Sequence, residues 1–260
     1  MWRSLGVLAL SLLLAGCGGG EGAPQPDETG AAPDTSPTSP AAPEPEPGPE
    51  VPASLLGTEW EVLPTSRKVV ALTFDCGANA DGVRSILSTL EETGAAATFL
   101  TGSWARAYPA LAAEIGAGYP VGNHTLGHVD LTGLTDAEAR REIRQGGAVV
   151  ARAAGRDPRP LFRFPYGARD ARTIALVNAL GYGSVRWTVD SLGWQGTAAG
   201  RSAETVEERV LAALRPGAIV LMHVGAAPDG STLDADALPT VVAAVRARGY
   251  RLVALDAFVG

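Results

Sequence analysis

The stretch Gly122-Asn123-His124-Thr125-Leu126-Gly127-His128 holds two of the three histidines in this chain of 260 residues. His124 and His128 are four positions apart, so on a helical turn their rings would project from the same face. Two imidazoles directed at one point are part of what a metal site requires. The alternative is a pair of surface or capping histidines beside a turn, and the rest of the chain has to decide between them.

The chain begins with the features of an export signal. Arg3 supplies a positive charge, residues 5–14 are apolar, and Leu14-Ala15-Gly16-Cys17 follows. About ten apolar residues are too few to cross a bilayer, so residues 1–17 are predicted to be a signal peptide. The last four residues resemble the lipobox of bacterial lipoproteins, which implies a lipid on Cys17 and an anchor on the outer side of a bacterial membrane. An ordinary secretory signal with a coincidental cysteine is the alternative.

Residues 18–57 are predicted to form a disordered tether. They contain ten prolines, seven acidic residues and no lysine or arginine. Such a composition cannot bury a core, and its like charges favour an extended chain. From residue 58 onward, 21 acidic residues face 20 basic ones, so the remaining domain is nearly neutral. A neutral domain offers no electrostatic basis for binding nucleic acid. With Cys17 lipidated, Cys76 is the only other cysteine, so no intrachain disulfide is expected.

Residues 58–260 are predicted to be one α/β domain, because short apolar runs alternate with amphipathic stretches. The predicted strands are 69–74, 97–100, 119–121, 161–164, 184–189, 218–222 and 251–255. The predicted helices between them are 81–92, 104–114, 136–153, 171–180, 203–214 and 235–248. Alternation of this kind predicts parallel strands with right-handed crossovers, and therefore an open doubly wound sheet or a barrel.

Polar side chains follow several of the predicted strands. In parallel α/β folds the functional residues gather at the carboxyl ends of strands. One edge of the sheet should therefore receive two carboxylates, one guanidinium and every histidine: Asp75, Asp190, Arg163, His124, His128 and His223. Each has a structural explanation by itself, such as a helix cap, a surface ion pair or a satisfied core histidine. Their joint occurrence at strand ends favours a functional site.

Five ordered motifs between residues 68 and 255 resemble those of the polysaccharide deacetylase family, which carries the NodB homology domain and is carbohydrate esterase family 4. They are TFDCG (73–77), NHTLGH (123–128), RFPYG (163–167), DSLGW (190–194) and LMH (221–223). The resemblance implies a distorted parallel barrel of seven or eight β/α units, of the NodB-homology type. It also implies a divalent metal, most often zinc, that helps to remove acetyl groups from N-acetylated sugars.

The resemblance also implies the roles of individual residues. Asp75 would be the general base, held ionised by Arg163, and His124 and His128 would hold the metal. His223 would be the general acid, and a carboxylate partner raises the pKa of such an imidazole. The resemblance gives that partner role to Asp190.

The same resemblance assigns residues that surround the acetyl group. The backbone N–H of Tyr166 would be an oxyanion donor, and Trp194 and Leu221 would be apolar walls around the acetyl methyl. For the last two, ordinary packing inside the barrel is an equally good explanation.

Cys76 departs from the family pattern, which has an aspartate there as the third metal ligand. A thiolate binds zinc well, so Cys76 is a candidate ligand. The alternative is a small buried thiol that binds nothing, with the metal held by two histidines and water.

Two functional hypotheses follow. The first is a metal-dependent carbohydrate N-deacetylase, expected to be monomeric, whose substrate is an extracellular N-acetylated polysaccharide such as peptidoglycan or a chitin-like N-acetylglucosamine oligomer. The second is a catalytically weak carbohydrate-binding or regulatory domain on the same fold. Retention of Asp75, Arg163, Asp190 and His223 favours the enzyme, because a module that only binds sugar needs neither an acid nor a base.

Overall fold

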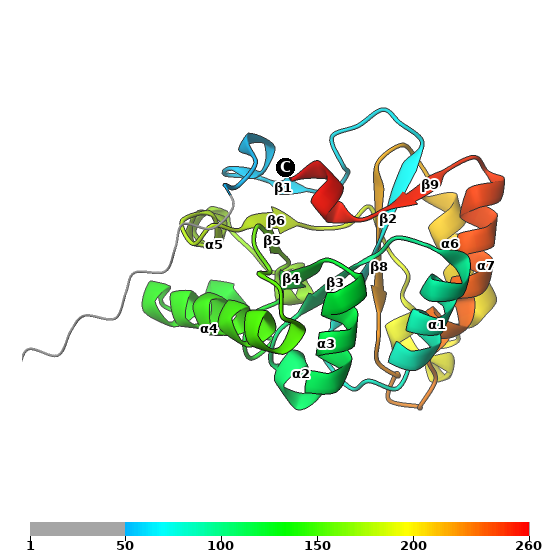
Figure 1. The fold of residues 1–260 in the computed structure, drawn as a ribbon, viewed down its shortest axis with the longest axis horizontal. Coiled ribbons are helices and arrows are strands. Elements are labelled where there is room, and N and C mark those ends of the chain that lie inside the picture. The colour runs from blue at the N-terminus through cyan, green and yellow to red at the C-terminus, as the bar shows by residue number, and fades with distance from the viewer. Residues whose placement is uncertain (1–49, 260) are drawn as a thin grey trace, which may run out of the picture. The chain divides into compact units, whose positions relative to one another are not determined.

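The computed structural model describes residues 50–259 (Figure 1). The predicted signal peptide, Cys17 and residues 18–49 of the predicted tether lie outside the described residues. The described part contains nine strands: β1 (Glu59–Trp60), β2 (Val69–Cys76), β3 (Thr98–Thr101), β4 (Val121–Asn123), β5 (Leu161–Phe162), β6 (Gly183–Val185), β7 (Val189–Asp190), β8 (Ala218–His223) and β9 (Arg251–Val253). Its seven α-helices are α1 (Val83–Thr93), α2 (Ser103–Ala107), α3 (Pro109–Gly118), α4 (Asp136–Ala154), α5 (Ala171–Asn178), α6 (Ala203–Ala212) and α7 (Leu233–Ala247).

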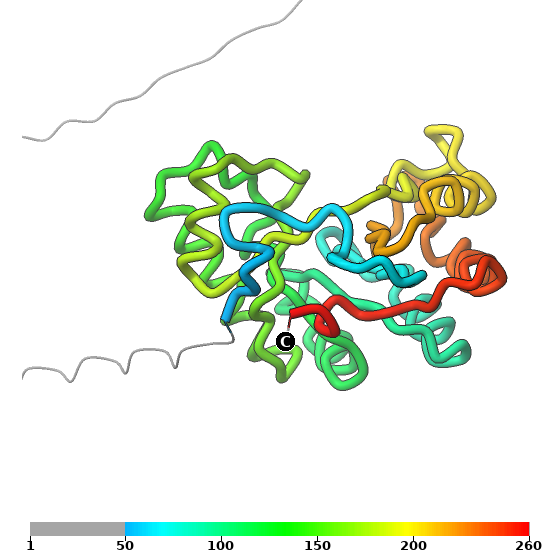
Figure 2. Tube along the Cα trace, turned by 90° about the horizontal axis from the view of Figure 1, so that it is seen from above, coloured from blue at the N-terminus to red at the C-terminus, as the bar shows by residue number. Residues whose placement is uncertain are grey.

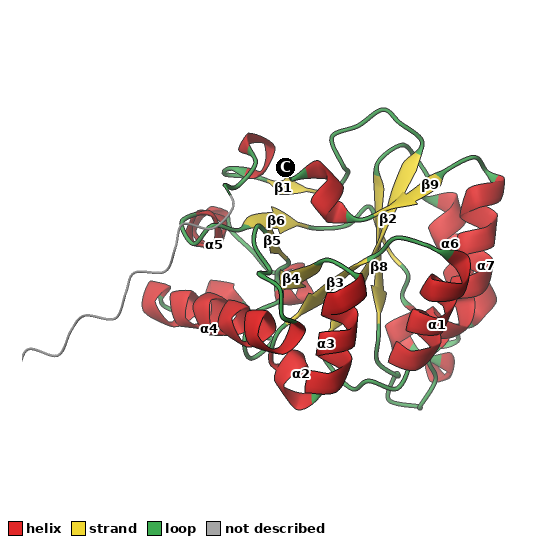
Figure 3. Cartoon of the chain, in the orientation of Figure 1, coloured by secondary structure: helices red, strands yellow, loops and turns green. Residues whose placement is uncertain are grey.

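The strands form one curled parallel sheet in the order β1-β6-β5-β4-β3-β2-β8-β7, and β9 pairs with the beginning of β2. Helices cover the outer face of the sheet (Figure 3). The edge strands β1 and β7 do not pair with each other; a single antiparallel bridge between Val62 and Ala218 joins the two sides. The predicted α/β class and distorted parallel barrel are therefore confirmed, with an open seam between β1 and β7.

The core has two layers because successive residues of a strand face opposite sides of the sheet. In β2, Val69 and Ala71 face the barrel interior, where they pack with residues such as Leu100 and Ile219. Val70, Leu72, Phe74 and Cys76 belong to the larger cluster that includes apolar residues of α1 and α7. All eight residues of β2 are buried, which explains its nearly unbroken apolar run.

The two described ends of the chain pack at the end of the barrel where β2 begins. Leu55, in a short 3-10 helix (Ala53–Leu55), is fully buried and packs in the interior cluster with Trp60 and Leu255. Figure 2 shows this first described segment, in blue, running beside the part of the chain that carries β6, and β1 pairs with β6. Residues 53–57 were expected in the tether, and they instead belong to the packed domain.

Two predicted elements are divided in the structure. The predicted strand 184–189 becomes β6 and β7, because residues 186–188 cross from one neighbouring strand to another. The Arg186 N–H donates to Trp60 O of β1, while the Thr188 N–H donates to Ile219 O of β8 and Thr188 Oγ1 donates to Glu61 O. The predicted helix 104–114 becomes α2 and α3, and Pro109 occupies the first position of α3, where its missing N–H costs nothing. None of the helices in residues 50–259 combines the length and apolarity that a membrane span needs.

Candidate active site

A pocket of about 720 Å³ opens at the carboxyl ends of the strands. The residues that line it include Asp75, His124, His128, Tyr166, Trp187, Asp190, Trp194, Leu221 and His223. The structure thus brings together eight of the ten predicted site residues within the described part of the chain. Arg163 lies beneath the pocket, and Cys76 does not reach it.

Asp75 is the last but one residue of β2, and its carboxylate faces the barrel interior. Oδ1 accepts a 2.8 Å hydrogen bond from Arg163 Nη1, and Oδ2 lies 3.5 Å from His124 Nε2. Burial by itself would raise the pKa of Asp75, but the adjacent Arg163, with help from His124 and His223, lowers that pKa below its usual value. Asp75 is therefore an ionised carboxylate with one oxygen held and the other at the pocket.

Arg163 is the largest fully buried side chain in the described residues, at 1% exposure. Besides Asp75, its guanidinium donates to Thr73 Oγ1 at 2.9 Å and to the carbonyls of Val185 and Arg186 at 3.1 and 3.0 Å. A buried cation is tolerated only when its donors are satisfied in this way. The arrangement fixes the orientation of the Asp75 carboxylate.

His124 and His128 lie on a loop after β4 and not on the helical turn that would direct both rings from one face. Thr125 and His128 have positive φ angles of 67° and 52°. The loop is held by the Asn123 side chain, which accepts from the Thr125 N–H and donates to Ile143 O of α4. Gly146 lets α4 approach, because a Cβ there would lie 2.6 Å from the Thr125 carbonyl carbon. The two imidazoles still meet, with ring centroids 4.9 Å apart.

Both imidazoles of this loop favour the neutral form. Burial lowers the pKa of His124, and burial together with the neighbouring His124 lowers the pKa of His128 to about 4. His124 Nδ1 lies 2.8 Å from Arg163 O, which assigns the proton to Nδ1 and leaves Nε2 as the lone-pair nitrogen facing Asp75. An imidazole held by a backbone carbonyl in this way is the form that binds metals.

Tyr166 lies over His128. Its hydroxyl is 3.2 Å from both His128 Nδ1 and His128 O, while the side chain is 73% exposed. Its backbone has a positive φ of 59°. Among the backbone hydrogen bonds that join loops and turns in the described residues, none uses the Tyr166 N–H.

His223 contacts a carboxylate different from the expected one. Asp234, in the first turn of α7, accepts the His223 backbone N–H at 2.8 Å and lies 3.6 Å from Nδ1 of the ring. Burial would lower the pKa of His223, but Asp234, with smaller effects of Asp75 and Asp190, raises that pKa above its usual value. The expected partner, Asp190, instead accepts from the Leu192 N–H and from Trp194 Nε1.

Leu221 and Trp194, the two residues expected as apolar walls, both line the pocket. Leu221 is buried at the end of β8, with His223 two residues further on the same face of the strand. Trp194 is 45% exposed, and its ring centroid lies 6.3 Å from that of His223. The Trp194–Asp190 hydrogen bond measures 3.2 Å, so Asp190 positions the indole.

Cys76 points away from the pocket, which matches the alternative of a small buried thiol and not that of a metal ligand beside the two histidines. Because β2 continues through residue 76, its side chain alternates with that of Asp75 and lies in the outer core cluster with Phe74. Burial, with the adjacent charge of Asp75, raises the pKa of this thiol well above its usual value. Cys76 therefore supplies no thiolate to the pocket in this structure.

Sequence reasoning missed three residues that line the pocket or contact a residue lining it. Asp234 lies eleven positions after His223, Trp187 lies between two short strands, and Asn79 follows the TFDCG motif. Asn79 Oδ1 accepts from the Ala226 N–H at 2.7 Å, and Nδ2 donates to Ala226 O at 3.2 Å. The signal that could have identified Asn79 is its position as a polar residue just after a strand. Asp234 had no such signal, because acidic residues are common at the start of any helix.

Two side chains of the pocket fit as ligands of a divalent metal. His124 and His128 supply neutral imidazoles at the pocket, and Asp75 is the adjacent carboxylate. Within residues 50–259 no group of three or more His, Cys, Asp or Glu side chains is already arranged around one metal position. The imidazole pair therefore fits the metal that the motifs imply, and the Cys76 thiol does not.

Comparison with known proteins agrees with the motifs. The family model described as polysaccharide deacetylase matches residues 63–185. A chitooligosaccharide deacetylase from Azorhizobium caulinodans is 32% identical over 210 residues, which are 76% of this chain and 98% of that protein. A peptidoglycan-N-acetylglucosamine deacetylase from Bacillus cereus is 31% identical over 195 residues, which are 74% of this chain and 68% of that protein.

Among solved structures, a mutant of a family 4 carbohydrate esterase pseudoenzyme with restored enzymatic activity is similar to this chain with a TM-score of 0.67. Its sequence identity is 26%, and the match covers 75% of this chain and 68% of that one. The near-complete span of the first relative, together with the family match and the shared fold, leads to one conclusion. This chain belongs to the polysaccharide deacetylase family.

Proposed function

We propose that this chain is a hydrolase that removes N-acetyl groups from an extracellular amino-sugar polymer. The observation that carries the proposal is the pair of groups facing one pocket, an ionised Asp75 and a His223 whose pKa is raised. Amide hydrolysis needs a base for water and an acid for the leaving amine, and these two groups supply them at neutral pH. The similar chitooligosaccharide and peptidoglycan deacetylases support the choice of an N-acetylglucosamine polymer.

In the proposed mechanism Asp75 Oδ2 takes a proton from water while Arg163 holds Oδ1. The water oxygen bonds to the acetyl carbonyl carbon, and in this proposal the Tyr166 N–H stabilises the oxyanion. His223, with Nδ1 turned toward Asp234, donates a proton from Nε2 to the sugar nitrogen as the C–N bond breaks. Acetate and a free amino sugar are the products. A divalent metal held by His124 and His128 would polarise the acetyl carbonyl.

We further propose zinc as that metal, because neutral imidazoles are among its preferred ligands. The test is acetate release from N-acetylglucosamine oligomers and from peptidoglycan, with and without a chelator. Asp75→Asn is the matched control, since it keeps the shape of the side chain and removes the base. The expected result is release that a chelator abolishes and added zinc restores. No acetate from either substrate at any metal concentration would contradict the proposal.

A catalytically weak domain on the same fold remains the second candidate, favoured by the outward orientation of Cys76 at the position of the family's third ligand. It predicts sugar binding with acetate release no faster than that of Asp75→Asn. Equilibrium binding to N-acetylglucosamine oligomers, measured beside turnover, separates the two candidates.

For localisation we propose a lipid anchor at Cys17 that holds a monomeric domain outside a bacterial membrane. The support is the lipobox-like Leu14–Cys17 sequence alone. Cys17→Ala should move the protein from the membrane fraction to the soluble fraction, and light scattering of the released protein should give the mass of one chain. Unchanged membrane association of the variant would contradict the anchor.

A further inference from the structure

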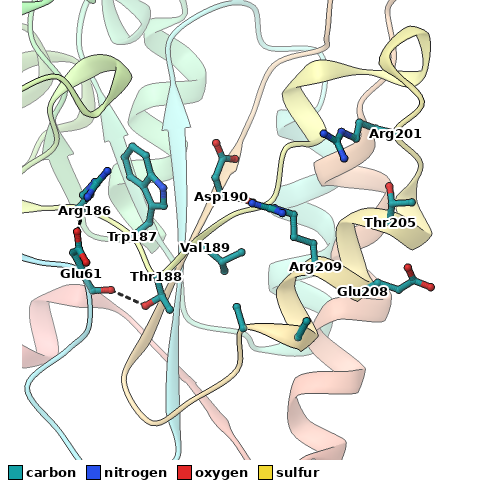
Figure 4. A pocket seen from close by; sticks show the side chains of 12 residues that line it. Glu61, Arg186, Trp187, Thr188, Val189, Asp190, Arg201, Thr205, Glu208 and Arg209 are labelled. Carbon is teal, nitrogen blue, oxygen red and sulfur yellow. Dashed lines mark hydrogen bonds and ion pairs between the residues drawn. The ribbon is translucent and has the colours of Figure 1, made fainter.

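A second hollow lies beside the candidate active site, at the open seam of the barrel. This groove has a volume of about 790 Å³, and the connection between β6 and β7 forms one wall while α6 forms the other (Figure 4). Trp187 and Asp190 line both the groove and the active-site pocket. A polymer bound with one acetamido group in the pocket can therefore extend into the groove.

Two arginines of this groove are anchored through one nitrogen only. Arg201 Nε donates to Gln195 Oε1 at 2.8 Å, and Arg209 Nε donates to the Asp190 carbonyl at 2.6 Å. Neither guanidinium has a carboxylate within 4.0 Å among residues 50–259, nor does any side-chain hydrogen bond of that part use their terminal nitrogens. Each arginine is thus held in orientation while its terminal N–H groups remain available.

The acidic residues of the groove do not neutralise these two cations. Glu61 is paired with Arg186 at 2.5 Å. The carboxylate of Asp190 is engaged by Leu192 and Trp194, on the side of the active site. Figure 4 shows the exposed Glu208 side chain directed away from Arg209, while Arg209 reaches toward Asp190. Glu208 itself makes no ion pair or side-chain hydrogen bond among residues 50–259, so the unengaged charges of the groove are two arginines and one glutamate, and their balance is positive.

We propose that Arg201 and Arg209 form an anion-binding subsite. It binds a carboxylate substituent of the polymer whose acetyl group is removed in the adjacent active-site pocket. A planar guanidinium with free terminal N–H groups matches a carboxylate in geometry and charge. Among N-acetylated glycans, such a subsite favours a polymer with acidic substituents over neutral chitin-like oligomers. Peptidoglycan is such a polymer, because it carries lactyl and peptide carboxylates. The inference rests on the proposed function and specifies its substrate class.

The test compares two forms of one polymer: peptidoglycan glycan strands freed of their peptides, with lactyl carboxylates either intact or converted to amides. The measured quantity is the ratio of kcat/KM for acetate release from the acid form to that from the amide form. Wild-type protein should favour the acid form, and Arg201→Ala with Arg209→Ala should lower the ratio about tenfold or more, mainly through KM. Raising the salt to about 0.15 M should lower the wild-type ratio. Strands that retain their peptides separate a lactyl preference from a peptide preference.

Arg144→Ala is the matched control, because Arg144 is an exposed arginine on α4, which lies on the opposite side of the barrel from α6 (Figures 1 and 2). It should leave the ratio unchanged, and thermal melting verifies that each variant folds. An equal ratio in the wild-type and doubly substituted proteins would overturn the subsite. If the wild-type protein releases no acetate at all, the proposed function fails, and binding of the Asp75→Asn protein to the acid and amide strands then decides the subsite by itself.

Discussion

Asp234 Oδ2 accepts the backbone N–H of His223 at 2.8 Å and lies 3.6 Å from the Nδ1 atom of its ring. Gly193 stands against the other oxygen: a Cβ at that position would overlap Asp234 Oδ1. The carboxylate, 3% exposed, thus fills space that a side chain at position 193 would need. A residue from the start of α7 thereby orients an imidazole at the end of β8.

The first prediction is that Asp234→Asn moves the alkaline limb of the pH–rate profile to lower pH. Asp234 contributes most to raising the pKa of His223, and a neutral amide removes that contribution. The protonated imidazole would then be lost at a lower pH, and turnover near neutral pH should fall on the order of 10-fold to 100-fold. The measurement is kcat/KM across the pH range for the parent and the variant.

Asp190→Asn is the comparison for that experiment, since Asp190 has the smallest of the named effects on the pKa of His223. Its alkaline limb should move less than that of Asp234→Asn; a larger shift would return the partner role to Asp190. Gly193→Asp alone should be damaging because of the overlap with Asp234. Combining Gly193→Asp with Asp234→Ala should recover part of the activity, because a carboxylate then returns to the same space.

The second prediction concerns the acidic limb. Because Arg163 lowers the pKa of Asp75, this carboxylate should remain ionised below the pH range in which an ordinary aspartate takes up its proton, and the acidic limb should lie there. Its depressed pKa also contributes folding stability that is present above the unfolded-state pKa and is lost as the pH falls through the folded-state pKa.

Asp75→Asn and His223→Ala should each cost on the order of 10²–10⁴ in rate with the fold retained. Nearly full activity in either variant would remove that residue from the mechanism.

The third prediction is that Arg163→Met destabilises the domain by about 3–5 kcal/mol, because it leaves the buried Asp75 carboxylate without its cation. Chemical denaturation measures this change. Adding Asp75→Asn to the Arg163→Met protein should restore part of the loss, since no buried charge then remains unpaired. Strictly additive effects of the two substitutions would show that the pair is not coupled.

The fourth prediction follows from the position of Leu55. A protein that begins at Val51 should fold and act in solution, whereas one that begins at Thr58 loses a fully buried side chain and the bond from the Gly57 N–H to Asn178. Leu55→Ala in the longer protein should cost about 2–5 kcal/mol. Thermal melting compares the three proteins. Equal stability of the two truncated forms would place Leu55 outside the folded core.

The long buried strands and amphipathic helices were predictable because their apolar patterns are strong. β2 and β8 each carry an apolar run; Asp75 is the last but one residue of β2, and His223 ends β8. β1 has only two residues, too few for any periodicity. The division of 184–189 depends on bonds from residues 186 and 188 to the segment around Glu61, more than 120 positions away. Pairings of that range leave no local pattern in the sequence.

The pocket itself was mostly predictable from the motifs, and the differences at His223 and Cys76 have physical reasons. The resemblance gave Asp190 as the partner of His223, and the two residues do end the neighbouring strands β7 and β8, but Asp234 at the start of α7 comes closer to the imidazole. Cys76 was a candidate ligand because it occupies the position of the family's third metal ligand and a thiolate binds zinc well. Since β2 continues to residue 76, the alternation of side chains turns it to the same side as Phe74.

The last prediction is that Cys76 does not hold the metal. Its thiol lies in the core cluster and its pKa is raised, whereas His124 and His128 face the pocket. Cys76→Ala should therefore leave zinc content and affinity unchanged and should cost about 1 kcal/mol of stability. His124→Ala and His128→Ala should each lower zinc affinity sharply.

Cys76→Asp should destabilise the fold more than Cys76→Ala does, because it places a carboxylate among apolar side chains. Metal analysis and a competition titration with a chelator measure all four variants. A marked loss of zinc in Cys76→Ala, or a gain in Cys76→Asp, would show that this strand end turns residue 76 toward the metal when it binds.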